Sequence, residues 1–247
     1  MKNSILNYLV IAAVLVLAAF SGCKKEEVNS GNNTGTSNLV SKVLLSGGED
    51  GTFEYHYDNQ NRITSITFNG NAYMTITYPD ANTIRIDVGG DFSFIFTKNN
   101  DGYVTKYGYI FNNLGITPLA ETFEYENGYL KKYEYESGEY SDYGYFHCVW
   151  ENANLISDGK NSYSYGTTLF KETNIAPYFN FAYIPFYGQI PIPISWFGKT
   201  SKNLMETLTY TEGEDAYISS YTYETNAEGY VTKVFNNGEL EYEIKYK

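Results

Sequence analysis

Apolar and polar residues alternate along most of the chain beyond residue 40. Residues 121–136 read ETFEYENGYLKKYEYE, with an aromatic residue at nearly every second position on both sides of Asn127-Gly128. Neighbouring side chains point to opposite faces of a β-strand, and aromatic residues favour that setting. Asn-Gly favours a two-residue hairpin turn. The segment therefore predicts two adjacent antiparallel strands in which Glu124 lies opposite Lys131.

The same alternation recurs along the rest of the chain. Short segments rich in Tyr, Phe, Ile, Val and Thr are separated by Gly, Asn and Asp turns, a spacing typical of antiparallel all-β proteins. We predict about a dozen strands in one antiparallel meander, strongly curled or barrel-like, with no long amphipathic helix. Examples are FEYHY and RITSITF around DNQN, AYMTITY after Asn69-Gly70, TIRIDV, and FSFIFT and YVTKYGYIF around KNNDG.

One segment, residues 174–203, breaks the alternation. It holds four of the six prolines, which deny a central strand its ladder hydrogen bonds, together with many aromatic residues. We expect an aromatic, proline-rich cap or plug packed over one opening of the sheet. The alternative is an exposed aromatic patch that binds a partner or a glycan.

The N-terminus has the three parts of a secretory signal peptide. Lys2 precedes an apolar run, Ile5–Phe20, which is short for a membrane-spanning helix, and Ser21-Gly22-Cys23 follows. The sequence LAAFSGC resembles a bacterial lipobox, which implies that Cys23 is diacylated and becomes the new N-terminus. We therefore predict a lipoprotein signal peptide at 1–22, a flexible tether at 23–38 and a single all-β domain at 39–247.

The predicted tether begins with charged residues and is otherwise rich in Gly, Asn, Ser and Thr, a flexible composition. Lys25-Glu26-Glu27 resembles the export signal of surface lipoproteins in Bacteroidetes-type bacteria. The resemblance implies an outer-membrane lipoprotein exposed at the cell surface. The alternative location is the periplasmic face.

The chain is strongly acidic, with 17 basic and 29 acidic side chains and a net charge of −12. Loss of residues 1–22 removes Lys2 and no acid, leaving −13. This charge repels phosphate backbones, so we predict no nucleic-acid partner, and membrane attachment through the acyl chains rather than through charge. Only Cys148 remains besides Cys23, so no internal disulfide forms.

Two features oppose a barrel embedded in the membrane. Outer-membrane strands need ~9–11 residues and an apolar lipid-facing band. Many segments here are shorter, and Glu, Lys, Thr or Ser occupy the alternate positions. We therefore expect the barrel to lie in water.

Catalytic signals are weak. His147 and Cys148 are adjacent on a strand and face opposite ways, which excludes a dyad, and only His56 remains as a second histidine, too few for a His-based zinc site. We expect no metal and no cofactor. Paired carboxylates could serve a glycosidase, but the alternation places the acidic residues on solvent-facing positions. These residues are Glu121, Glu124, Glu126, Glu134, Glu136, Glu139 and Asp142.

Aromatic side chains are the best candidates for ligand contact, because their faces bury apolar area while their polar atoms form hydrogen bonds. The candidate ligand-binding residues are Trp150, Trp196, Tyr183 and Tyr187. The leading hypothesis is a non-enzymatic surface binding module for a glycan or a protein. The alternatives are a structural component of an envelope assembly and, behind it, a carboxylate-dependent glycosidase.

A family resemblance rests on Phe197–Tyr210, FGKTSKNLMETLTY, and on repeated Y-x-Y and GY-[VL]-x-K segments. Together they resemble a Bacteroidetes lipoprotein family, a domain of unknown function with a porin-like β fold. The tyrosine repeats are also distantly similar to the Tyr-Asp repeats of Rhs proteins. The resemblance implies a porin-like fold and carries over no catalytic or binding residue.

Overall fold

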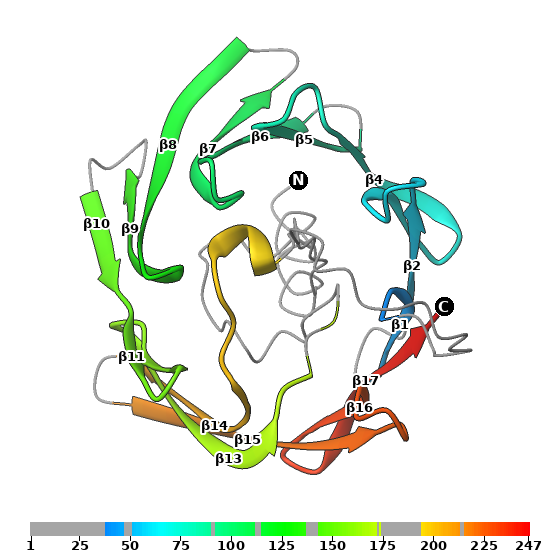
Figure 1. Ribbon diagram of the computed structural model, residues 1–247, viewed down its shortest axis with the longest axis vertical. Coiled ribbons are helices and arrows are strands. Elements are labelled where there is room, and N and C mark those ends of the chain that lie inside the picture. Colours follow the sequence, from blue (N-terminus) through cyan, green and yellow to red (C-terminus); the bar gives the residue numbers. More distant parts are fainter. Residues whose placement is uncertain are drawn as a thin grey trace, which may run out of the picture.

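The protein is one antiparallel sheet of seventeen strands that curls into a nearly closed barrel (Figure 1). A computed structural model describes residues 38–46, 51–89, 92–111, 115–136, 143–171, 173, 194–212 and 215–247. The predicted all-β, barrel-like class is confirmed. The strands outnumber the predicted dozen in part because Val40–Leu45 adds a strand and residues 143–151 form two strands.

The strands follow one another in chain order, and a single 3-10 helix is described, Ile194–Phe197. The strands are β1 Val40–Leu45, β2 Gly51–Tyr57, β3 Ile63–Phe68, β4 Asn71–Thr77, β5 Thr83–Val88, β6 Phe92–Lys98, β7 Val104–Phe111, β8 Gly115–Glu126, β9 Tyr129–Glu136, β10 Tyr143–His147, β11 Val149–Glu151, β12 Asn154–Ser157, β13 Asn161–Leu169, β14 Asn203–Glu212, β15 Asp215–Thr225, β16 Val231–Asn236 and β17 Glu239–Tyr246.

The ring closes where the first strand meets the last. β1 pairs with β17 on one side and with β2 on the other. Between β9 and β12 the sheet continues through two short consecutive strands, β10 and β11. β10 pairs with β9, and β11 pairs with β12. The bend lies at Cys148, whose backbone N–H donates to the Lys131 carbonyl oxygen at 2.9 Å. The pairing of β1 with β17 covers the two end edges that an open sheet would present.

The hairpin of residues 121–136 forms as predicted, but its register differs by one residue. Asn127 and Gly128 both have positive φ (55° and 84°), as the two-residue turn requires. A bulge then places Glu124 opposite Lys132, so the predicted pairing of Glu124 with Lys131 is wrong. A bulge inserts one extra residue into one strand, and alternation alone does not reveal it.

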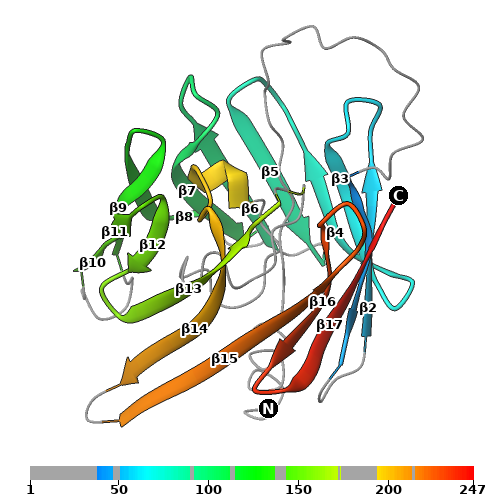
Figure 2. The ribbon, with the colours of Figure 1, turned by 60° about the horizontal axis from the view of Figure 1, so that its bottom comes forward.

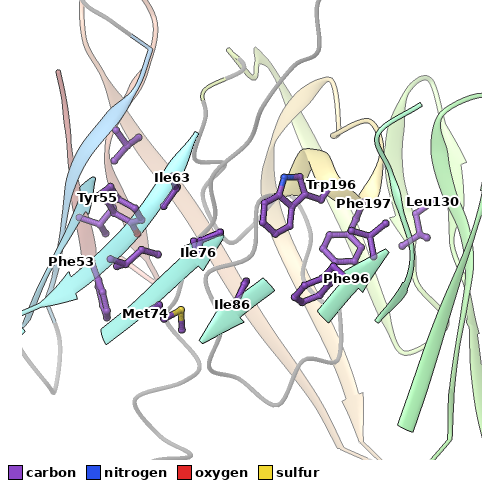
Figure 3. Close-up of a cluster of buried hydrophobic side chains, with 14 of the residues drawn as sticks. Phe53, Tyr55, Ile63, Met74, Ile76, Ile86, Phe96, Leu130, Trp196 and Phe197 are labelled. Carbon is purple, nitrogen blue, oxygen red and sulfur yellow. The ribbon is translucent and has the colours of Figure 1, made fainter. Parts of the chain in front are cut away.

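The two faces of the barrel wall have opposite polarity. The buried side chains of the inner wall are mainly apolar, and Figure 3 shows several of them, such as Phe53 on β2, Ile63 on β3 and Ile86 on β5. The outward face carries charged pairs, such as Lys42 Nζ with Glu54 Oε1 at 2.5 Å. Further outward pairs are Arg85–Asp87 at 2.8 Å and Lys233–Glu224 at 2.8 Å. Burial of the apolar face is what drives this sheet to curl.

The 3-10 helix lies inside the ring (Figure 1). Trp196 and Phe197 are only 3% and 0% exposed, and they point toward Phe96 in Figure 3. The Trp196 ring centre lies 6.0 Å from that of Phe96, and Phe197 lies 5.0 Å from Phe123. The end of the predicted cap segment therefore packs into the barrel interior. Residues 174–193 of that segment lie outside the described residues.

The barrel has two distinguishable rims. Both ends of the described chain meet at one of them, where the Lys247 N–H donates to the Leu39 carbonyl oxygen at 2.9 Å. We call this the terminal rim. Because the strands run up and down in turn, successive connections alternate between it and the opposite, distal rim. The distal rim carries the Asn69-Gly70 and Asn237-Gly238 turns.

Three hairpin turns at the terminal rim, at residues 58–62, 99–103 and 226–230, share one hydrogen-bond pattern. The first residue, Asp58, Asn99 or Asn226, donates its N–H to the carbonyl of the fifth at 2.8–2.9 Å. Its side-chain oxygen accepts the fifth residue's N–H at 2.9–3.0 Å. A short Asn or Asp side chain can do this because it reaches its own following backbone. The sequence turns DNQN, NNDG and NAEG are therefore one structural device.

Residues 1–37, with Cys23, the predicted signal peptide and the predicted tether, lie outside the described residues. Their assignments stay predictions. Within the part of the chain that is described, no helix is both long and apolar enough to cross a membrane.

We predict that Asn99→Ala lowers the free energy of unfolding by about 1–2 kcal/mol, because the Asp101 and Tyr103 amides lose their side-chain acceptor. Denaturant unfolding followed by tryptophan fluorescence measures the change. Asn100→Ala, in the same turn at an exposed position, is the matched control. Equal stability of the two variants would show that the side-chain acceptor does not hold the turn.

Candidate functional site

The terminal rim is lined by aromatic clamps, each built from three residues. The first residue follows a turn, and its side chain packs on an aromatic ring from the far end of the same hairpin. The hydroxyl or indole N–H of that aromatic residue donates to the backbone carbonyl of a third residue, which directly follows the first one in the sequence. The best-defined example joins Tyr103, Tyr125 and Val104: the two rings lie 5.1 Å apart, and Tyr125 Oη donates to the Val104 carbonyl at 2.6 Å.

The clamp recurs around the rim with different residues. Tyr246 Oη donates to the Val231 carbonyl at 2.6 Å and packs on Tyr230 at 5.5 Å. In another copy the first residue is an arginine instead of a tyrosine, with Arg62 lying 4.4 Å from the centre of the Tyr78 ring, and Tyr78 donates to the Ile63 carbonyl at 3.0 Å. The GY-[VL]-x-K repeat of the sequence is therefore explained by architecture. Its Gly makes the turn, its Tyr packs in the clamp, and its Val or Leu is buried.

Trp150 occupies the tyrosine position of one clamp. Its Nε1–H donates to the Leu130 carbonyl at 2.7 Å, and its ring lies 4.7 Å from that of Tyr129. The predicted ligand candidate is thus half-buried and already satisfied by the protein. Trp196 is buried in the interior, as described above, so the second candidate presents no solvent-facing ring. Tyr183 and Tyr187 lie outside the described residues, and their candidacy stays a prediction.

Lysines cover the outer faces of several rim rings. Lys171 Nζ lies 4.2 Å from the centre of the Tyr230 ring, and Lys247 Nζ lies 4.2 Å from that of Tyr57. Lys199 Nζ lies 5.1 Å above Tyr129 and also donates to the Asn127 carbonyl at 2.8 Å. Such cation–π contacts stabilise by ~0.5–1 kcal/mol at exposed sites. With a partner ring and a cation both packed against each of them, Tyr129 and Tyr230 offer little surface to a sugar.

The clamp predicts a measurable loss in Tyr246→Phe. The variant removes the hydroxyl that satisfies the Val231 carbonyl and should lower the free energy of unfolding by about 1–2 kcal/mol in denaturant titrations. Tyr217→Phe removes an exposed hydroxyl and serves as the control, with an expected change below ~0.5 kcal/mol. An unchanged Tyr246→Phe variant would contradict the clamp.

The interior holds a buried carboxyl group, Glu121, on β8. It is only 7% exposed and accepts a hydrogen bond from Tyr107 Oη on Oε1 at 2.8 Å. Its Oε2 is buried with no hydrogen-bond partner. Burial raises the pKa of Glu121 from its ordinary value of 4.5 to about 8, and the Tyr107 hydrogen bond opposes this shift. Glu121 is therefore protonated at neutral pH.

The position of Glu121 corrects the expectation that all strand carboxylates face solvent. Glu121 shares the parity of Phe123 and Tyr125, whereas Glu124 and Glu126 share the other parity and are exposed. Because every second side chain of a strand points to the same face, Glu121 lies among the aromatic rings of the inner wall. The alternation of residues 121, 123 and 125 could have revealed this from the sequence.

A second carboxyl group, Glu241 on β17, also has a raised pKa. Burial raises the pKa of Glu241 to about 7, the neighbouring Tyr242 hydroxyl opposes this shift, and Oε2 is again buried without a hydrogen-bond partner. It sits at a bulge, since Val234 pairs with Tyr242 but Phe235 pairs with Leu240. β8 and β17 lie on opposite sides of the ring (Figure 1). The two groups are therefore not the pair ~5–10 Å apart that glycoside hydrolysis requires.

Glu121 makes the stability of the fold depend on pH. Its folded pKa of about 8 exceeds the unfolded value. The contribution of the protonated Glu121 carboxyl to the free energy of unfolding is therefore complete below pH ~4.5 and is lost as the pH rises through 8. We predict that Glu121→Gln, which keeps an acceptor for Tyr107, flattens this decline and gains on the order of 3 kcal/mol at pH 9. Unfolding measured at several pH values tests it.

The control for that experiment is Glu124→Gln, at an exposed position on the same strand. It should leave the pH dependence as in the unaltered protein. A decline equally steep in Glu121→Gln would show that Glu121 does not carry the effect.

His147 and Cys148 occupy opposite sides of the wall, as predicted. His147 is exposed, whereas Cys148 is half-buried and packs against the core. Burial, followed by the nearby Asp158 carboxylate, raises the pKa of the Cys148 thiol to about 12. A thiol with so high a pKa is a poor nucleophile at neutral pH. Among the described residues, no group of three or more His, Cys, Asp or Glu could hold a metal ion.

Two of the exposed large apolar side chains lie on one hairpin at the distal rim. Residues 209–212 of β14 and 215–219 of β15 form what we call the arm, which Figure 2 shows reaching past the neighbouring strands. Tyr217 and Ile218 are each 62% exposed. Adjacent strand residues point to opposite faces. Both faces of the arm are therefore open to solvent, unlike the walls of the barrel.

Comparison with known proteins identifies the fold. No family model matches the chain, and no curated protein matches it in sequence. A porin-like protein from Bacteroides uniformis ATCC 8492 superposes with a TM-score of 0.60 at 16% identity, over 86% of this chain and 99% of that chain. A porin-like protein from Bacteroides vulgatus ATCC 8482 gives a TM-score of 0.51 at 13% identity, over 85% and 98%. The porin-like β fold implied by the sequence resemblance is confirmed.

Proposed function

We propose that the protein is a lipid-anchored, non-enzymatic module of the bacterial cell envelope that binds another protein. One observation carries the proposal: the chain enters the barrel at one rim, and the arm of β14 and β15 extends from the other. If Cys23 is acylated, the tether joins the terminal rim at Leu39 and fixes it toward the membrane. The arm, with Tyr217 and Ile218, then faces away from the membrane.

The polarity of the wall supports a barrel that stands in water. A barrel that spans a membrane has an apolar outer band and a polar interior. Here the described inner wall is apolar and the outer wall carries ion pairs, such as Lys42–Glu54 and Lys233–Glu224. Charged residues on a lipid-facing wall would cost up to ~2–4 kcal/mol each. Lipid attachment through Cys23 leaves the outer wall free for water.

The choice of a protein ligand over a glycan rests on the aromatic residues. Glycan binding needs an aromatic face that a sugar ring can cover. The rim rings are instead held in clamps and capped by lysines, and Trp196 is buried. The arm offers apolar side chains and strand backbone, which are the groups that a polypeptide recognises.

An enzymatic role has little support from the described residues. The two carboxyl groups with raised pKa lie on opposite sides of the ring, and the Cys148 thiol is held in its neutral form. Burial is the main cause of the raised pKa of each carboxyl group and of the thiol. We therefore infer binding rather than catalysis.

A cell-binding experiment tests the class of ligand. Fluorescently labelled protein without its membrane anchor is titrated onto cells of the producing bacterium that lack the native protein. Separate batches of cells are first treated with trypsin or with periodate. We expect saturable binding that trypsin abolishes and periodate leaves unchanged, because trypsin removes surface proteins while periodate oxidises sugars.

Two outcomes would contradict the proposal. Binding that periodate abolishes and trypsin spares would identify a glycan as the ligand. An absence of saturable binding would favour a structural component of an envelope assembly. Heat-unfolded protein is the control for non-specific adhesion.

A further inference from the structure

The arm has one strand edge that no described strand covers. β14 pairs with residues 215–220 of β15 on one side. On the other side, β16 pairs with β15 only from Tyr221 onward, where Tyr221 lies opposite Asn236. Among the described residues, 215–219 therefore have a ladder partner on one side alone. An open strand edge is a template for pairing with another chain.

The hydrogen bonds at Ser220 show which backbone groups face that edge. The Ser220 carbonyl accepts the Asn237 N–H at 2.7 Å, and the Ser220 N–H donates to Asn237 Oδ1 at 2.9 Å. Ser220 thus directs its backbone toward the β16 side. In an antiparallel strand every second residue does the same. The N–H and carbonyl groups of Ile218 and Ala216 therefore point outward along the open edge, whereas those of Tyr217 point toward β14.

The side chains at this edge are apolar on both faces. Ile218 projects from one face and Tyr217 from the other, each 62% exposed, and Ala216 is also exposed. A bound strand would place its own side chains beside both of them. Backbone hydrogen bonds would supply affinity, and these two side chains would supply selectivity.

The charge of the arm indicates the chemistry of its partner. From residue 209 to residue 219 the sequence of the arm contains three acidic residues, Glu212, Glu214 and Asp215, and no Lys, Arg or His. The stretch from Ala216 to Ser220 is uncharged. An uncharged edge beside an acidic turn is complementary to an extended segment that combines apolar residues with lysine or arginine.

We propose that the partner binds by adding a strand to the β15 edge at residues 215–219, through an extended, basic and apolar segment of another protein. This inference rests on the proposed function and specifies its mode. A second copy of the chain fits less well. Antiparallel self-pairing would bring the acidic residues of each copy close to the net negative barrel of the other, and like charges repel.

The test uses the whole protein in detergent micelles and synthetic peptides. The probe peptide alternates valine and threonine between terminal lysines. One control peptide has glutamates in place of the lysines, and another has its backbone N-methylated along one edge. We expect the lysine peptide to bind, and each control to bind about tenfold more weakly or not at all.

Hydrogen exchange resolved to single amides reports on the edge directly. In the free protein the Ala216 and Ile218 amides should exchange rapidly while the Tyr217 amide is protected. The lysine peptide should slow exchange at Ala216 and Ile218 by about tenfold or more. This readout needs no variant and so does not depend on a substitution being tolerated.

Substitution provides a second readout. Ile218→Pro deletes an N–H that faces the open edge, so the fold should persist while peptide binding falls about tenfold or more. Ile218→Ala keeps that N–H and is the matched control, with a smaller loss. Undiminished binding to Ile218→Pro and to the N-methylated peptide would overturn strand addition in favour of charge attraction alone.

Two further outcomes separate this inference from the proposed function. If no peptide binds and exchange is unchanged, yet trypsin-sensitive cell binding persists, the strand-addition mode is overturned and the proposed function stands. If the protein instead forms concentration-dependent dimers in sedimentation experiments that Ile218→Pro dissociates, the edge belongs to a second copy and the proposed partner is overturned.

Discussion

The structure depends on one constraint: a wide ring of strands has an apolar inner wall that must be kept from water. A barrel of about eight strands can be filled by its own inward side chains, whereas this ring has seventeen strands and encloses more space than that. The aromatic content answers this demand, since each ring buries ~150–250 Å². Trp196 and Phe197, delivered by the 3-10 helix, add aromatic area from inside the ring.

The same constraint explains the chemistry of the interior. A carboxyl group that faces such a wall loses its hydration, so its neutral form is favoured and its pKa rises. Glu121 and Glu241 both show this effect, and each retains a buried oxygen without a hydrogen-bond partner. Groups of this kind often mark active sites. Here they lie on opposite sides of the barrel, and burial alone accounts for them.

The two rims of the barrel differ in structure. At the terminal rim, repeated turns and clamps hold strand ends together through bonds such as Tyr125 to Val104. The rim thereby satisfies backbone carbonyls that would otherwise face the edge of the core. At the distal rim the β14–β15 hairpin continues beyond β16 and leaves an edge open. Side-chain bonds to the backbone recur where the chain begins and ends, and the open strand edge lies at the opposite rim.

Much of the fold was predictable from the sequence, because strand period and turn chemistry are local. Alternation with Asn-Gly and Asn-x-x-Gly turns predicted an antiparallel, barrel-like meander. The solvent-facing position expected for Glu121 was wrong, although Glu121 shares the parity of Phe123 and Tyr125. Register was less accessible: the bulge that pairs Glu124 with Lys132 depends on the neighbouring strand. The burial of the two candidate tryptophans was not accessible either, since a half-buried and a fully buried tryptophan look alike in a sequence.

By itself, then, the sequence determined the class of fold, the positions of the turns and the acidic character of residues 209–219. Each follows from a side chain and its nearest neighbours along the chain. Only the tertiary structure decided that β1 meets β17, that Trp150 completes a clamp while Trp196 is buried, and that β15 outreaches β16. These features depend on which distant segments become neighbours when the ring closes, and closure is a property of the whole sheet.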